Sequence, residues 1–151
     1  MSSSKYLPFI KEVYKAMSKV DNFQRVANKC RVVNVEEGRC VVEFEVAEEH
    51  ENPHGTLHGG LTATLVDIVT TSALLATERG HPGVSTDLGV SYLAAAKTGE
   101  TVVVDAKVLK MGKTLAFTTA DLYRKSDNTM IATGRHTKAF PAGMAGGKKT
   151  K

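Results

Sequence analysis

The sequence predicts an α+β domain in which a mainly antiparallel, curved sheet is wrapped around one long central helix. Residues 59–77 form a long apolar stretch whose only charge is Asp67. Six segments with strand-like composition lie on either side of it along the chain, and few of their connections are long enough for a crossover. A single apolar helix must bury itself against another layer, and the only layer predicted here is a sheet.

The first part of the chain supplies a surface helix and two strands. Apolar residues between Leu7 and Met17 recur at helical spacing, which predicts an N-terminal amphipathic helix. Strands are expected at residues 30–35 and 39–46. In the second of these, the apolar residues at 40, 42, 44 and 46 alternate with residues 41, 43 and 45, two of which are acidic. Residues 48–57 are polar and contain a proline and a glycine, so they are expected to form a loop.

The central helix is expected over residues 58–79, because a glycine and a proline follow it closely. The four strands expected after it cover residues 84–93, 101–110, 114–124 and 130–138. Tight turns at residues 110–113 and 125–128 join neighbouring strands as hairpins. We expect a single domain over residues 1–140 and a flexible basic tail over residues 141–151.

The charge of the chain argues against nucleic acid as a partner. The formal net charge is +4, but Lys148, Lys149 and Lys151 lie in the tail, which leaves the body with a single net positive charge. A nearly neutral body lacks the basic surface that binding to DNA or RNA requires. A local patch that holds an anionic ligand is still compatible with this composition.

Cysteine usage and the N-terminal residues bear on the compartment. Cys30 and Cys40 form no C-x-x-C pair and have no metal-ligand spacing, so we expect a reducing intracellular compartment and no metal. Residues 5–19 carry too many charges for a secretory signal, although a weak mitochondrial presequence is an alternative. The low-charge run around Asp67 is close to the length of a membrane span, but its threonines make it too polar, so no transmembrane segment is expected.

The start of the central helix is a candidate oxyanion hole. A helix that begins with Gly59 and Gly60 offers unpaired backbone N–H groups with no side chain in the way, and these carry the positive end of the helix dipole. Such donors stabilise a carbonyl oxygen that develops negative charge. Gly59 is the candidate donor. The alternative is that the glycines only allow the helix to pack closely against a strand.

Asp67 is the candidate base or nucleophile. It lies in the helix interior, where it cannot cap, and no charged residue lies three or four positions from it. A lone carboxylate on an apolar helix is costly unless function requires it, which favours catalysis over an ion-paired structural acid. If desolvation dominates, its pKa is expected to be raised, which suits a base that works near neutral pH.

Helix geometry separates these two groups. Gly59 and Asp67 are eight residues apart, or roughly 12 Å along one helix at about 1.5 Å per residue. A donor and a base that act on one carbonyl must both lie within about 3 Å of the reacting atoms. We therefore expect a two-fold homodimer with antiparallel central helices, in which Asp67 of one subunit faces Gly59 of the other.

These residues also resemble a known family. The chain resembles the hotdog-fold acyl-CoA thioesterases in four features. They are the motif N-P-H-G-T-L-H-G-G at residues 52–60, the acid seven positions after the last of these glycines, T-E-R-G at residues 77–80 and the strand at residues 84–88. The likeness extends from about residue 11 to residue 138. It implies a hotdog fold, dimers that pair into a tetramer, and hydrolysis of medium- to long-chain fatty acyl-CoA to fatty acid and CoA. It also implies a cytoplasmic location with mitochondrial association.

The resemblance assigns roles by position. Asp67 would orient or activate water, the Gly59 N–H would polarise the thioester carbonyl, Asn52 and His58 would place water and substrate, and Ser85 would support the water. Coenzyme A is part of the substrate, and no further cofactor is implied. The residues expected to bind it are Asp87, Tyr92, Leu93, Ala94, Ala95, Ala96, Lys97, Lys110, Met111, Gly112, Lys113 and Thr114.

Taken singly, several of these residues have a simpler interpretation. Asn52 before a proline is typical of a turn, His58 of a loop histidine bound to backbone, and Lys110 and Lys113 of a solvated hairpin. Two other functions also fit. A hotdog hydratase or dehydratase could use His50, His54 or His58, and a non-catalytic acyl-CoA-binding scaffold would keep the pocket alone. Leu57, Leu61 and Leu65 favour an aliphatic acyl chain over an aromatic one.

Overall fold

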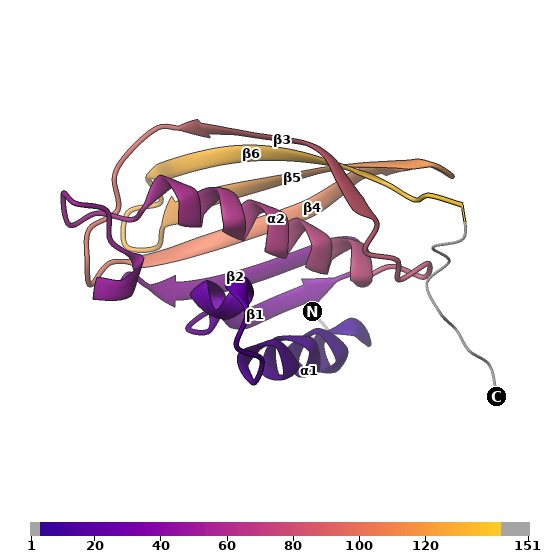
Figure 1. Cartoon of the computed structure of the whole chain (residues 1–151), viewed down its shortest axis with the longest axis horizontal. Coiled ribbons are helices and arrows are strands. Elements are labelled where there is room, and N and C mark those ends of the chain that lie inside the picture. The colour runs from indigo at the N-terminus through magenta and orange to yellow at the C-terminus, as the bar shows by residue number, and fades with distance from the viewer. Residues whose placement is uncertain (1–3, 143–151) are drawn as a thin grey trace.

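The computed structural model describes residues 4–142, and its central feature is one six-stranded sheet (Figure 1). The strands are β1 (Arg31–Glu36), β2 (Arg39–Glu45), β3 (Val84–Tyr92), β4 (Thr101–Met111), β5 (Leu115–Arg124) and β6 (Met130–Ala139). Their order in the sheet is β1-β2-β4-β5-β6-β3, and every neighbouring pair is antiparallel. The expected α+β class is confirmed.

Helix α2 (Gly59–Leu75) lies along the inner face of this curved sheet (Figure 1). Its apolar side chains, among them Leu65, Val66 and Val69, are fully or almost fully buried in the main core. The helix approaches β6 closely at Gly134, because a Cβ atom built on this glycine would lie 2.8 Å from the side chain of Val66. Gly134 therefore allows the middle of α2 to contact the residues that follow on β6.

Helix α1 (Tyr6–Ser18) packs against β1, as the amphipathic pattern predicted (Figure 1). Its buried residues are Ile10 and Tyr14, and the Tyr14 hydroxyl lies 3.0 Å from the Ser72 hydroxyl of α2. Two short 3-10 helices, η1 (Phe23–Ala27) and η2 (Glu48–His50), were not predicted. The first of these continues from α1 toward the exposed side of α2.

The prediction that the central helix extends to residue 79 is wrong. The helix ends at Leu75, and the carbonyl oxygen of Ala76 accepts a hydrogen bond of 2.7 Å from the Gly38 N–H in the β1–β2 turn. The Thr77 hydroxyl donates back to the Leu74 carbonyl, which satisfies another terminal acceptor. Apart from residues 141 and 142, the expected tail lies outside the described residues.

Both cysteines are shielded from solvent, Cys40 completely and Cys30 in part. Cys40 is fully buried in the core and Cys30 is partly buried beside it. Burial raises the pKa of each thiol to about 12. Both side chains therefore remain protonated at neutral pH and contribute to packing. Within residues 4–142, no helix has both the length and the apolar character needed to cross a bilayer.

Candidate active site

The N-terminus of α2 presents a free backbone donor. His58, the residue before the helix, is extended (φ −63°, ψ 129°), and its Nδ1 atom accepts a hydrogen bond of 2.8 Å from the Gly60 N–H. The Gly59 N–H has no hydrogen-bond acceptor among residues 4–142. His58 therefore caps one terminal donor and leaves the neighbouring one available to a ligand.

Asn52 organises the loop that precedes this helix start. Its side-chain oxygen accepts hydrogen bonds from the N–H groups of His54 and Thr56, at 2.9 and 3.1 Å. Its amide nitrogen donates to the Thr56 hydroxyl at 2.8 Å, which uses one of its two hydrogens. Asn52 therefore has the geometry of a turn residue, which was its simpler interpretation. One N–H hydrogen of its side-chain amide has no acceptor among the described residues.

The segment from Tyr92 to Lys97 lies beside the same helix end. The Tyr92 hydroxyl donates to the Gly59 carbonyl at 2.7 Å, and the Leu57 N–H donates to the Ala96 carbonyl at 2.8 Å. An isolated bridge also pairs Thr56 with Lys97. Of the expected coenzyme A-binding residues, Tyr92 thus contacts Gly59 itself, and Ala96 and Lys97 pair with the residues just before the helix, within one chain.

Asp67, in the middle of α2, differs from the sequence-based expectation in two ways. Its side chain is 48% exposed in the single chain, so the desolvation considered from the sequence is not supplied by this chain alone. It is also not isolated, because Asp67 Oδ1 lies 3.9 Å from His136 Nε2 on β6. No helical neighbour supplies this contact. It comes from a strand almost 70 positions further along the chain.

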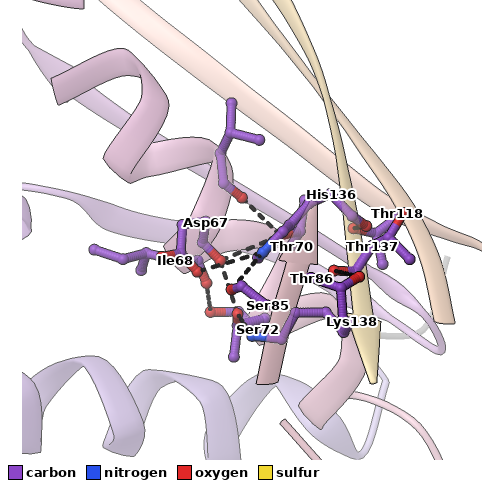
Figure 2. A network of polar contacts seen from close by, with 12 residues as sticks. Asp67, Ile68, Thr70, Ser72, Ser85, Thr86, Thr118, His136, Thr137 and Lys138 are labelled. Atoms are coloured by element: carbon purple, nitrogen blue, oxygen red, sulfur yellow. Dashed lines mark hydrogen bonds and ion pairs between the residues drawn. The ribbon is translucent and has the colours of Figure 1, made fainter. Parts of the chain in front are cut away.

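His136 is the centre of a buried polar network next to Asp67 (Figure 2). The ring is fully buried, with Nδ1 2.7 Å from the Thr70 hydroxyl of α2 and Nε2 2.7 Å from the Ser85 hydroxyl of β3. Burial lowers the pKa of His136, and the nearby Lys138 ammonium lowers it further, against the opposite effect of Asp67 and Asp87. The imidazole is therefore neutral near pH 7.

Lys138 faces the same side of β6, two residues further on. It is only 5% exposed, and its Nζ atom donates to the Thr71 hydroxyl at 3.0 Å. Burial lowers the pKa of this lysine, while Asp67 acts in the opposite direction. The Asp67 carboxylate thus has a buried cationic side chain and a neutral imidazole on its inner side, and solvent on the other.

A hollow of about 300 Å³ opens beside the start of α2. Its wall combines apolar side chains with polar and acidic ones. The apolar residues are Phe23, Val26 and Leu61, and the others include Glu49, His50, Glu51, His58 and Thr64. A second, smaller hollow is lined by Phe23, Thr64, Asp67 and Leu88. Phe23, which is 66% exposed, borders both. The surface between the helix start and Asp67 is therefore apolar with a few polar groups, as is typical of small-molecule sites.

The second expected coenzyme A segment lies at the opposite end of α2. The Arg79 guanidinium, just beyond the helix C-terminus, donates to the carbonyl oxygens of Gly112 and Lys113, both at 2.7 Å, and stacks on Phe140. A 17-residue helix is about 25 Å long. One chain therefore does not bring residues 110–114 to the Gly59 end.

Sequence reasoning missed the partners of Asp67 on β6. His136 and Lys138 are ionisable residues at alternate positions, on the strand face that also carries Ala132 and Gly134. Ionisable residues on a strand face whose other side chains are small or apolar are unusual. Asp67 was identified by the same kind of signal, a charge on an otherwise apolar helix. Within residues 4–142, no three His, Cys, Asp or Glu side chains are grouped closely enough to hold a metal ion.

Comparison with known proteins defines the class. The family model described as "Thioesterase superfamily" matches residues 54–131, so the chain belongs to the thioesterase superfamily. The human protein named acyl-coenzyme A thioesterase 13 is 56% identical over 129 residues, which cover 85% of this chain and 92% of that protein. The mouse protein of the same name is 51% identical over the same shares.

Solved structures of thioesterase superfamily members resemble this chain in fold. The crystal structure of zebra fish thioesterase superfamily member 2 has a TM-score of 0.89 and 47% identity, and covers 91% of this chain and 100% of that one. The mouse thioesterase superfamily member 2 structure has a TM-score of 0.84 at 46% identity and covers 91% of this chain and 99% of that one. The resemblance to hotdog-fold thioesterases, and the hotdog fold that it implied, are confirmed.

Proposed function

We propose that this protein is an acyl-CoA thioesterase that hydrolyses medium- to long-chain fatty acyl-CoA to fatty acid and coenzyme A. The observation that carries the proposal is the combination of a free Gly59 N–H at a helix start with the Asp67 carboxylate on the exposed face of the same helix. Membership of the thioesterase superfamily and the names of the human and mouse relatives support it.

In the proposed mechanism the Gly59 N–H donates to the thioester carbonyl oxygen. Asp67 accepts a proton from a water molecule whose oxygen attacks the carbonyl carbon, and the negative charge that develops on the carbonyl oxygen is stabilised at the helix start. When the tetrahedral intermediate collapses, the C–S bond breaks and the thiolate of coenzyme A leaves, to be protonated by Asp67 or solvent. The remaining N–H of Asn52 is available to the substrate or water, and Ser85 supports the attacking water.

A homodimer completes this site. The exposed face of α2 carries Gly60, Thr64, Asp67 and Thr71, whose small side chains allow a second helix to approach. With two α2 helices antiparallel across a two-fold axis, Asp67 of one subunit faces Gly59 of its partner. The same operation brings residues 110–114 of one subunit toward residues 92–97 of the other.

This arrangement suits coenzyme A. Lys97, Lys110 and Lys113 supply positive charge for its phosphates. Asp87, which the family resemblance also assigns to coenzyme A binding, lies on β3. The acyl chain is proposed to enter the hollow beside Phe23 and Leu61, whose apolar wall favours an aliphatic chain. No cofactor beyond the coenzyme A of the substrate is required for the hydrolysis.

The hydratase or dehydratase alternative is less well supported. Each of its candidate histidines other than the exposed His54 is bound to backbone: His50 Nδ1 accepts from the Ala47 N–H, and His58 Nδ1 accepts from the Gly60 N–H. The only histidine beside Asp67 within residues 4–142 is His136, and both of its ring nitrogens contact hydroxyl groups.

The test of the proposed function measures release of coenzyme A from saturated acyl-CoA esters of increasing chain length. Asp67→Asn is expected to lower kcat by a factor of roughly 100 to 10,000 while binding of the ester is kept. Asp121→Asn on β5, which removes a carboxylate that accepts from Thr133, is the matched control and should leave turnover unchanged. Intact thioester after incubation with the unmodified protein would contradict the proposal and favour a scaffold or a hydratase.

We also propose that dimers pair into a tetramer and that the protein is cytoplasmic with mitochondrial association. These two proposals rest on the family resemblance. Light scattering of the purified protein should give four times the chain mass of 16.2 kDa. Cell fractionation should recover the protein in the cytosolic and mitochondrial fractions.

A further inference from the structure

We propose that His136 is a positioning residue that fixes the direction of the Ser85 hydroxyl, so that Ser85 offers only acceptor lone pairs to the attacking water. The inference rests on the proposed hydrolysis and adds a buried residue to its machinery. It follows from the hydrogen bonds around the imidazole ring, followed outward from the core (Figure 2).

The inner end of this chain of hydrogen bonds is Thr70. Its hydroxyl oxygen lies 2.7 Å from the Val66 carbonyl oxygen and 3.2 Å from the Asp67 carbonyl oxygen. Carbonyl oxygens only accept, so the single hydroxyl hydrogen of Thr70 is used within the helix. The remaining contact, 2.7 Å to His136 Nδ1, requires a donor on the ring. His136 therefore carries its proton on Nδ1.

This tautomer sets the direction of the next hydrogen bond. A neutral imidazole with a proton on Nδ1 has a lone pair on Nε2. The Ser85 hydroxyl, 2.7 Å from Nε2, must then donate its only hydrogen to the ring. Ser85 is exposed on its other side, where its oxygen can accept but cannot donate.

The attacking water is oriented by two acceptors as a result. Ser85 Oγ and Asp67 Oδ1 lie 2.7 and 3.9 Å from the same Nε2 atom, so both oxygens border one side of the ring, and the proposal places the attacking water between them. Such a water donates one hydrogen to each and directs an oxygen lone pair away from them, toward the thioester carbonyl carbon. Asp67 removes one of these hydrogens as the new C–O bond forms.

A proton on Nε2 would reverse this arrangement. The ring would then donate to the Ser85 oxygen, and the serine hydroxyl hydrogen would point outward. That hydrogen would bind the lone pair of the water that has to attack the carbonyl carbon. The charged groups that face the ring are Asp67 on α2, Asp87 on β3 and Lys138 on β6. The carboxylates favour a protonated ring, but burial and Lys138 outweigh them and keep the pKa of His136 below its usual value.

A matched pair of substitutions separates this role from a structural one. Thr70→Val removes the acceptor of Nδ1–H, whereas Thr118→Val removes a hydrogen bond of 2.7 Å to the His136 backbone carbonyl and leaves the ring contacts intact. Both threonines are buried.

We expect Thr70→Val to lower kcat roughly tenfold or more, since a reversed hydrogen bond between His136 and Ser85 costs the transition state about as much as a lost one. Thr118→Val should leave kcat unchanged, and Thr70→Ser should restore it. Equal kcat in the two valine variants would overturn the proposal.

A double-mutant cycle tests whether His136 acts through Ser85. His136→Asn and Ser85→Ala should each lower kcat, and the double variant should be no slower than Ser85→Ala alone. Multiplicative effects, or full activity of Ser85→Ala, would contradict the inference. Failure of the proposed function is a different result, because the unmodified protein would then release no coenzyme A.

The tautomer itself can be measured without turnover. Long-range ¹H–¹⁵N correlation spectra of the unmodified protein should show the His136 proton on Nδ1 at pH 7, and those of Thr70→Val should show a shift toward Nε2. A proton on Nε2 in the unmodified protein would refute the inference even if every acyl-CoA ester were hydrolysed.

Discussion

The hydroxyl of Tyr92 at the end of β3 donates to the carbonyl oxygen of Gly59, the first residue of α2, at 2.7 Å. The same ring covers Gly59, because a Cβ atom there would lie 3.3 Å from the tyrosine ring. The first turn of the helix, which carries the proposed oxyanion donor, is thus held by a side chain from an edge strand of the sheet.

Tyr92→Phe should therefore lower kcat by roughly fivefold, since one hydrogen bond contributes about 1 kcal/mol and its loss loosens the donor. The measurement is the rate of coenzyme A release at saturating substrate. Tyr123→Phe on β5, where the hydroxyl makes no hydrogen bond within residues 4–142, is the control and should keep the full rate. A change in KM alone would mean that Tyr92 contacts substrate without positioning Gly59.

Mixed dimers test the shared site. Gly59→Pro removes the candidate donor N–H at the first helical position, where proline is favoured, and the extended His58 is compatible with a following proline. Asp67→Asn and Gly59→Pro proteins should each be inactive. After subunit exchange, half of the dimers hold one intact site, so activity should return to about one quarter of the unmodified level.

Mass spectrometry of the assembled dimers would verify that exchange took place. If exchanged dimers remain inactive, Gly59 and Asp67 do not act together across subunits. If the mixture recovers no activity because no exchange occurred, co-expression of the two variants with different tags supplies the mixed dimer directly.

Phe23 is expected to influence the choice of acyl chain. Its exposed ring borders both hollows beside Asp67 and His58. Phe23→Ala should lower kcat/KM for long-chain esters by roughly tenfold, the scale of lost apolar contacts in a specificity pocket, and should affect acetyl-CoA little. Phe9→Ala, on the surface of α1, is the control. An equal loss for all chain lengths would contradict a role in chain recognition.

Stability should depend on pH through two buried histidines. Burial lowers the pKa of both His50 and His136 in the folded protein. The unfolded chain therefore binds more protons as the pH falls below about 6.5, and the free energy of unfolding should decrease toward pH 5. Urea unfolding at several pH values measures this slope. His136→Gln should make it shallower, and an increase in stability on acidification would contradict the assignment.

The fold was predictable because its main signals are local. Alternating strands, hairpin turns and one nearly uncharged helix identify their elements without reference to the rest of the chain. The end of α2 was not predictable, since the Ala76 carbonyl is bound by the Gly38 N–H from a distant turn. The 3-10 helix at residues 23–27 also has no strong periodic signal.

The candidate site was predictable on α2 and only partly elsewhere. Gly59 and Asp67 stand out because helix ends and apolar helix interiors restrict what a residue can do there. Their environment could not be derived locally, because His136 approaches Asp67 from β6, a strand that lies close to α2 at Gly134. Which residues two strands bring to one carboxylate depends on register, and register is fixed by the whole sheet.

The burial of both cysteines has a practical consequence for every rate measurement outlined above. A disulfide reagent that reports free thiols reacts with thiolates, and a pKa of about 12 leaves Cys30 and Cys40 almost entirely as unreactive thiols while the chain is folded. The colour that develops in such an assay would therefore come from the released coenzyme A, and a slow background from the protein would report its own unfolding.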